Sequence, residues 1–184
     1  MIYLDNAATS YPKPNSVYQN VMKAMTEYGA NPGRGSHSMA IEGARVIYET
    51  RELLSQLFNL DDPMRAIFTF NATDGLNQAI KGVLNSGDHV ITTSMEHNSV
   101  LRPIKELEKY GVENTIVQCS PDGSLNVEDI EAAIKENTRL VVLTHVSNLT
   151  GTIMPVEKVG QMCRDRNILF LVDGSQSAGV LDID

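Results

Sequence analysis

Residues 168–176 read Ile-Leu-Phe-Leu-Val-Asp-Gly-Ser-Gln. The apolar residues at the start follow one another without polar alternation, which is typical of a strand buried on both faces, as in a parallel sheet covered by helices. The run ends at Asp173, and the Gly-Ser pair after it predicts a turn. Ligands of open α/β sheets bind just beyond the carboxyl ends of the strands, so Asp173 is a candidate functional carboxylate. The alternative is that Asp173 only caps the turn that follows it.

The rest of the chain repeats this order of strand and helix. Strands are predicted at 66–70, 90–93, 115–119, 140–145 and 168–172, and helices between them at 73–84, 100–110, 127–135 and 156–165. Two more helices are predicted near the N-terminus, at 15–28 and 36–57, joined by a glycine-rich loop. Such alternation predicts an α/β fold of three layers, in which a mainly parallel sheet is flanked by helices.

The composition is that of an ordinary globular protein, with 42% hydrophobic and 21% charged residues in a chain of 184. The net charge of -8 argues against a nucleic acid or an anionic membrane surface as the partner. No apolar run approaches the roughly 20 residues of a membrane span, and no signal-peptide pattern follows Met1. The only cysteines, Cys119 and Cys163, are too few for a disulfide framework, so we expect a reducing, cytoplasmic compartment.

Four polar side chains each follow a separate predicted strand: Thr73, His97, Asn148 and Asp173. Taken singly, each has an ordinary explanation as a helix cap, a solvated loop residue or a turn residue. Parallel strands present their carboxyl ends at one edge of a sheet, however, so the four are expected to converge there. The convergence, rather than any one residue, predicts a ligand site.

The residue types at this edge suit pyridoxal 5'-phosphate. A threonine hydroxyl and backbone N–H groups at a helix N-terminus suit a phosphate. An imidazole can stack on a ring, and a carboxylate can keep the pyridine nitrogen protonated, which makes the ring an electron sink. The glycine fingerprints of dinucleotide and P-loop nucleotide sites do not occur in the sequence.

Six segments, in this order along the chain, carry a more specific signal: Tyr3-Leu4-Asp5-Asn6-Ala7-Ala8-Thr9, Arg34-Gly35-Ser36-His37, Thr73-Asp74-Gly75, Met95-Glu96-His97-Asn98, Thr144-His145-Val146-Ser147-Asn148 with Gly151-Thr152, and Val172-Asp173-Gly174-Ser175-Gln176. Together they resemble the fold-type I pyridoxal-phosphate enzymes of the class V aminotransferase superfamily. More specifically, they resemble its cysteine desulfurase and selenocysteine lyase branch, and the resemblance covers essentially the whole chain.

The resemblance implies a role for each residue at the cofactor. Asp173 would pair with the pyridinium nitrogen, and Gln176 would donate to the phenolic oxygen. His97 would stack on the ring and assist proton transfer, while Thr73 would bind the phosphate. Asn148 would lie near both the phenolic oxygen and the substrate. His97 and Asp173 are therefore the expected catalytic residues.

The resemblance also implies a substrate and partners. Ala7 and Ala8 would line the approach of an amino-acid substrate, and Arg34 would reach the site of the other subunit in a homodimer. Cysteine would give up its sulfur to an enzyme cysteine as a persulfide, with alanine released, and a sulfur-acceptor protein would follow. Neither nucleic acid nor membrane is expected as a partner.

The chain departs from the family pattern at its end. The family's Schiff-base lysine follows a histidine beyond the strand that carries the aspartate, and no lysine follows Asp173 here. The family's catalytic cysteine and carboxylate-binding arginine also lie later. We therefore expect the N-terminal part of such an enzyme, inactive alone, in which residues 1–14 join a small domain and residues 15–184 form a partial large domain.

Three alternatives stay open from the sequence. One is a class V aminotransferase or another pyridoxal-phosphate lyase that acts on a different amino acid. Another is a non-catalytic interaction module, which would need none of the cofactor residues. The third is a metal site formed by His89, His97 and His145, although no two histidines have the helical spacing of a metal motif.

Overall fold

The computed structural model describes residues 2–183 and divides the chain into two compact units. One unit comprises residues 2–67 with 182–183, and the other comprises residues 68–181. All the strands lie in the second unit. The assignment of residues 1–14 to the small domain of a longer enzyme stays a prediction.

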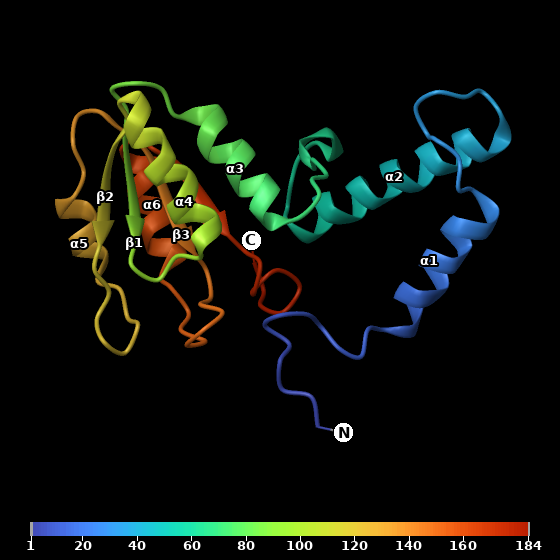
Figure 1. Ribbon diagram of the computed structural model, residues 1–184, viewed down its shortest axis with the longest axis horizontal. Helices are drawn as coiled ribbons and strands as arrows, with labels where there is room; N and C mark the ends of the chain where they lie inside the picture. The colour runs from blue at the N-terminus through green and yellow to red at the C-terminus, as the bar shows by residue number, and fades with distance from the viewer. Residues whose placement is uncertain (1, 184) are drawn as a thin grey trace. The chain divides into compact units, whose positions relative to one another are not determined.

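The unit of residues 68–181 is built on a four-stranded sheet (Figure 1). Its strands are β1 (His89–Thr93), β2 (Glu113–Val117), β3 (Thr138–Thr144) and β4 (Leu169–Asp173), in the order β2-β1-β3-β4. All three neighbouring pairs are parallel, which confirms the prediction from the sequence. The carboxyl ends of the strands therefore lie at the same edge, where Thr144 of β3 pairs with Asp173 of β4.

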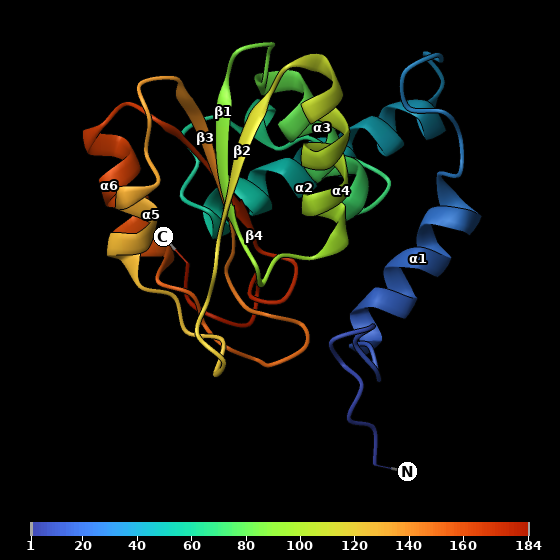
Figure 2. The same cartoon turned by 60° about the vertical axis from the view of Figure 1, so that its left-hand side comes forward.

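Helices cover both faces of this sheet and give the three layers that the sequence predicts (Figure 2). The helices α3 (Ala72–Val83) and α4 (Asn98–Leu107) lie on one face, and α5 (Val127–Ala132) and α6 (Val156–Asp165) lie on the other. A short 3-10 turn, η2 (Glu108–Tyr110), extends α4.

Successive side chains of a central strand pack alternately against the helices on the two faces of the sheet. On β3, Leu140 and Val142 pack in the core beside α3 and α4, whereas Val141 and Leu143 pack in the core beside α5 and α6. All four side chains are at most 2% exposed. Burial on both faces explains why the strand sequence is apolar without alternation.

The prediction of a strand at 66–70 is wrong, because this segment is irregular in the structure. Phe70 is 99% exposed, and its N–H donates to Asp74 Oδ2 at 3.2 Å rather than to a neighbouring strand. A strand needs another strand to pair its N–H and C=O groups, and apolar content alone does not supply one. The strand predicted at 115–119 also lies two residues earlier, as β2.

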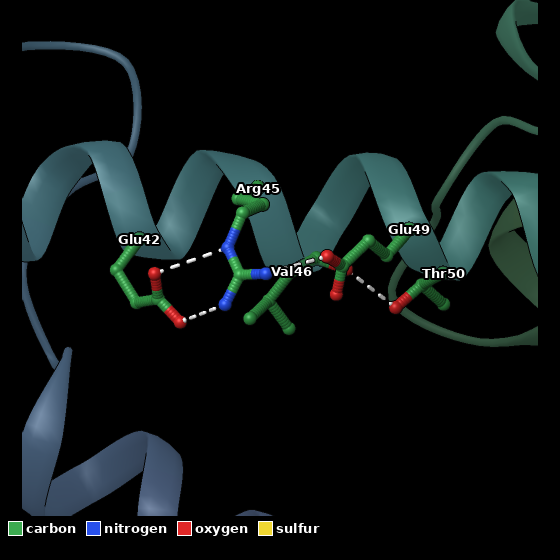
Figure 3. Close-up of polar contacts among 5 residues, drawn as sticks. All are labelled: Glu42, Arg45, Val46, Glu49 and Thr50. Atoms are coloured by element: carbon green, nitrogen blue, oxygen red, sulfur yellow. Dashed lines mark hydrogen bonds and ion pairs between the residues drawn. The ribbon is translucent and has the colours of Figure 1, made fainter.

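The unit of residues 2–67 contains α1 (Asn15–Glu27), α2 (Ser38–Leu57) and the 3-10 turn η1 (Pro63–Arg65). On α2, Arg45 forms ion pairs with Glu42 at 2.6 Å and Glu49 at 2.8 Å (Figure 3). These exposed pairs contribute little to stability, since water screens them. No described helix is long and apolar enough to cross a bilayer.

Candidate functional site at the carboxyl edge of the sheet

Three of the expected cofactor residues lie at the carboxyl edge of the sheet. Asp173 ends β4, His97 precedes α4 directly after the end of β1, and Thr73 lies in the first turn of α3. Thr73 and His97 line a hollow of about 240 Å³, together with Asn77, Asn98, Ser99, Arg102, Pro103 and Glu106. The predicted convergence of these elements at one edge is thus present in the fold.

Asp173 is a buried carboxylate, only 7% exposed. Its Oδ1 accepts hydrogen bonds from Ser175 N at 3.0 Å and Ser175 Oγ at 2.5 Å, so it does cap the turn that follows β4. Across the sheet, His145 N donates to the carbonyl oxygen of Asp173 at 3.0 Å. No lysine or arginine among residues 2–183 forms an ion pair with Asp173. A buried carboxylate without a cation is costly, and a protonated pyridine nitrogen is a cation that would compensate it.

The N-terminus of α3 is capped by its own sequence. Asn71 Oδ1 accepts from Asp74 N at 2.9 Å, while Asp74 Oδ2 accepts from Phe70 N. This cap satisfies one of the four N–H groups that a helix leaves unpaired at its start. Thr73 is exposed in the same turn. The helix dipole and the hydroxyl of Thr73 are therefore compatible with a phosphate at this position.

His97 is the N-cap residue of α4. Its Nδ1 accepts from Ser99 N at 3.2 Å and lies 2.7 Å from Ser99 Oγ. Because Nδ1 accepts this N–H, the neutral imidazole carries its proton on Nε2. The residue is otherwise exposed, so its ring is free to stack on a flat ligand.

Glu96 is a residue of this edge for which no role is predicted from the sequence. It is 7% exposed, and its Oε1 accepts from Thr93 Oγ1 at 2.8 Å and from Thr144 N at 3.0 Å. Burial, and to a smaller extent the negative charge of Asp173, raises the pKa of Glu96 to about 7. The spacing of Thr93 and Glu96, which matches the [ST]-x-x-[DE] pattern of a capping box, is the signal that could have indicated this contact.

The other expected site residues lie in the loops after β3 and β4 or in the unit of residues 2–67. Asn148 is exposed in the loop after β3, which is closed by the hydrogen bond from Ser147 N to Thr152 O at 3.0 Å, and Gln176 is partly buried in the turn after β4. Ala7, Ala8 and Arg34 are exposed in the unit of residues 2–67. Their relation to the carboxyl edge therefore stays a prediction.

The histidine metal site has no support in the structure. His89 lies at the start of β1, where its ring nitrogens lie 2.8 Å from Thr138 Oγ1 and 2.9 Å from Thr115 Oγ1, and His97 lies beyond the other end of the same strand. Within the described part of the chain, no three side chains of His, Cys, Asp or Glu come together as metal ligands.

The fold defines the class of protein, which is a three-layer α/β protein with a candidate ligand site at the carboxyl ends of parallel strands. The chain belongs to the aminotransferase class-V family, whose model matches residues 2–184. Membership of this family implies pyridoxal phosphate as the cofactor, and the buried carboxylate of Asp173, which has no ion pair among residues 2–183, fits its protonated pyridine nitrogen.

Individual relatives are similar over the whole of this chain. Cysteine desulfurase IscS of Shewanella pealeana is 40% identical over 189 residues, and that of Dechloromonas aromatica is 36% identical over 188. Each alignment covers 100% of this chain and 46% of the relative, so the chain spans about half the length of the curated relatives that it matches.

Solved structures give the same result. A structure described as SspA in complex with cysteine has a TM-score of 0.91 and 31% sequence identity. The match covers 100% of this chain and 53% of the SspA chain. The apo structure of a cysteine desulfurase from Thermococcus onnurineus also has a TM-score of 0.91, with 32% identity, covering 99% of this chain and 46% of its own. The three-layer fold is therefore the fold of this family.

Proposed function

We propose that this chain supplies the cofactor-binding part of a pyridoxal-phosphate-dependent cysteine desulfurase. The observation that carries the proposal is the buried Asp173, which has no cationic partner among residues 2–183 and lies at the same sheet edge as His97 and the N-terminus of α3. The names of the relatives support cysteine as the substrate.

When bound, pyridoxal phosphate would supply an electron sink for the reaction of the amino acid. Asp173 would hold the proton on the pyridine nitrogen, and Gln176 would donate to the phenolic oxygen. The first turn of α3 binds the phosphate through Thr73 and its N–H groups. His97 would stack on the ring and would exchange a proton through Nε2, because its Nδ1 accepts the hydrogen bond from Ser99 N.

Four residues bind the substrate in this proposal, three of them from the unit of residues 2–67. Ala7, Ala8 and Arg34 contact the amino acid, with Arg34 acting in the partner subunit's site, and Asn148 contacts it from the strand end. Overall, the sulfur of cysteine passes to an enzyme thiol as a persulfide, alanine leaves, and a sulfur-acceptor protein takes the sulfur from the persulfide. Neither Cys119, which is partly buried, nor the buried Cys163 is assigned as that thiol.

A homodimer is part of the same proposal. The helices α1 and α2 carry apolar side chains that are exposed in the single chain, among them Val21 at 54%, Met25 at 74% and Leu53 at 65%. Apolar surface of this kind is typical of a face covered by another subunit. Light scattering of the purified protein should give the dimer mass; a monomer at all concentrations would contradict this assignment.

Turnover requires residues that these 184 do not contain, since no lysine follows Asp173. We therefore expect the chain alone to bind pyridoxal phosphate reversibly and to release neither alanine nor sulfide from cysteine. Activity is expected in a protein with the length of the relatives. Alanine or sulfide produced by the isolated chain would show that the missing lysine is not essential.

Cofactor binding is measured by equilibrium dialysis of the chain against pyridoxal phosphate. The substitution Asp173→Ala is expected to weaken binding by at least about tenfold, because it removes a hydrogen bond between charged groups. The matched control is Asp165→Ala, which changes an exposed carboxylate at the end of α6, before β4 begins. Equal affinity of wild type and Asp173→Ala would show that the role given to Asp173 is wrong.

The substrate is tested in a protein of the relatives' length by adding cysteine and measuring alanine and sulfide. Cofactor binding without sulfide release would favour an aminotransferase or another lyase that acts on a different amino acid. Failure of the wild-type chain and of the longer protein to bind pyridoxal phosphate would instead favour an interaction module.

A further inference from the structure

Glu96 has the hydrogen-bond pattern of a neutral carboxylic acid. Both of its donors, Thr93 Oγ1 at 2.8 Å and Thr144 N at 3.0 Å, meet the same oxygen, Oε1. The other oxygen, Oε2, is buried and has no hydrogen-bond partner among the described residues. In the protonated form Oε1 is the carbonyl oxygen that accepts both hydrogen bonds and Oε2 is the hydroxyl, whose proton finds no acceptor among the described residues. An ionised Oε2 at the same place would leave a buried charge without a donor, which costs more, so the arrangement favours the protonated form.

The surroundings of Glu96 compensate a negative charge only in part, because the hydrogen bonds from Thr144 and Thr93 lower its pKa by less than burial raises it. No lysine or arginine among residues 2–183 forms an ion pair with it. The titratable groups at the neighbouring strand ends are His97 beside it, His145 after β3 and Asp173 at the end of β4. Burial raises the pKa of Glu96 to about 7, and the charge of Asp173 acts in the same direction.

Glu96 also connects the elements that carry the candidate cofactor residues. It is adjacent in the chain to His97, and its bond to Thr144 N reaches the last residue of β3, which is the cross-strand partner of Asp173. The bond to Thr93 closes the turn between β1 and His97. One side chain thus fixes the loop of residues 94–97 against the strand that borders Asp173.

We infer that Glu96 is a positioning residue of the cofactor site: as a neutral acid it ties the His97 loop to β3 and adds no second buried negative charge beside Asp173. One buried carboxylate then matches one protonated pyridine nitrogen, whereas two would repel each other. The role toward the cofactor rests on the proposed function, but the contacts and the protonation of Glu96 are independent of it.

Two measurements on the chain without cofactor test the inference directly. The infrared difference spectrum between wild type and Glu96→Gln at pH 6 is expected to contain the carbonyl band of a protonated carboxylic acid, and its absence would overturn the neutral form. In NMR spectra, Glu96→Ala is expected to shift the imidazole signals of His97, whereas Glu96→Gln, which keeps an oxygen acceptor, leaves them close to wild type. Unshifted His97 signals in Glu96→Ala would overturn the positioning role.

Affinity for pyridoxal phosphate separates positioning from general destabilisation. Glu96→Ala is expected to bind about tenfold more weakly, through loss of the bridging bonds, and Glu96→Gln is expected to restore affinity. The matched control is Val159→Ala, which opens a cavity in the core beside α5 and α6 and should leave affinity unchanged. Equal loss in Glu96→Ala and Val159→Ala would overturn the inference. If wild type binds no cofactor, the proposed function fails, and the infrared and NMR results still decide the role of Glu96.

Discussion

Replacing Glu96 by glutamine is expected to stabilise the chain at pH 8 and to leave its stability almost unchanged at pH 5. Burial raises the pKa of Glu96 from its ordinary value of 4.5 to about 7. The folded state therefore binds this proton more tightly than the unfolded state. The contribution of the proton to the unfolding free energy is fully present below pH 4.5 and is lost as the pH rises through 7. Glutamine has no charge to bury at any of these pH values.

The size of the effect follows from the two pKa values. At about 1.4 kcal/mol per pH unit, the difference between them corresponds to roughly 3 kcal/mol of unfolding free energy at pH 8. Glutamine keeps a side-chain oxygen that can accept from Thr93 and Thr144, so most of the loss through ionisation is expected to disappear in Glu96→Gln.

The assay is urea unfolding of wild type and Glu96→Gln at pH 5, 6, 7 and 8, with the difference between the two proteins taken at each pH. Other groups titrate equally in both proteins, so their contributions cancel in the difference. Glu136→Gln, which changes an exposed glutamate, is the control and should give a flat difference. A difference for Glu96→Gln that does not change between pH 5 and 8, or that favours wild type as the pH rises, would refute the reasoning.

Other parts of the fold give further predictions. Burial, and then the charge of Lys135, lowers the pKa of His89, so wild type should lose stability as the pH falls below about 6.5, and the difference from His89→Gln in urea unfolding should change over this range; a constant difference would contradict it. Asn71→Ala should reduce the unfolding free energy by about 1 kcal/mol, because the cap to Asp74 N is lost, whereas Asn71→Ser should retain most of it; equal losses would show that the cap is unimportant. Phe70→Ser should change the unfolding free energy by less than about 0.5 kcal/mol, since the side chain is exposed; a large loss would mean that residue 70 is packed.

The sequence predicts the sheet of this protein well where burial is on both faces. The apolar run of β3 predicts a covered, parallel strand, and residues 140–144 are buried in the structure. The run at 168–172 also forms a parallel strand, but β4 lies at the edge of the sheet, where Leu169 is 43% and Val172 37% exposed, so the expected burial on both faces is not found. The segment at 66–70 has a similar composition and forms no strand. The apolar composition of the segment does not show whether another strand lies beside it to pair with. Pairing depends on the tertiary structure, so it cannot be read from the segment alone.

The sequence predicts the candidate site only where the order of strands and helices places its residues. Strand order and direction place Asp173 and His97 at one edge, which the alternation of elements already implies. Thr73 follows no strand in the structure, and it reaches this edge because the first turn of α3 lines a hollow together with His97. The burial of Glu96 was not predictable in the same way. A glutamate beside a loop histidine is usually solvated, and only the fold brings Thr144 N within 3.0 Å of its carboxyl group.

The central claim is that one edge of the sheet binds pyridoxal phosphate, and backbone amide NMR during a titration with the cofactor measures this most directly. The largest shifts are expected at residues 72–75, 95–99, 145–148 and 173–177. Signals at the other end of the strands, around Gly87, Gly111 and Asn137, should stay in place. Shifts concentrated at that opposite end, or no shifts at saturating cofactor, would contradict the account.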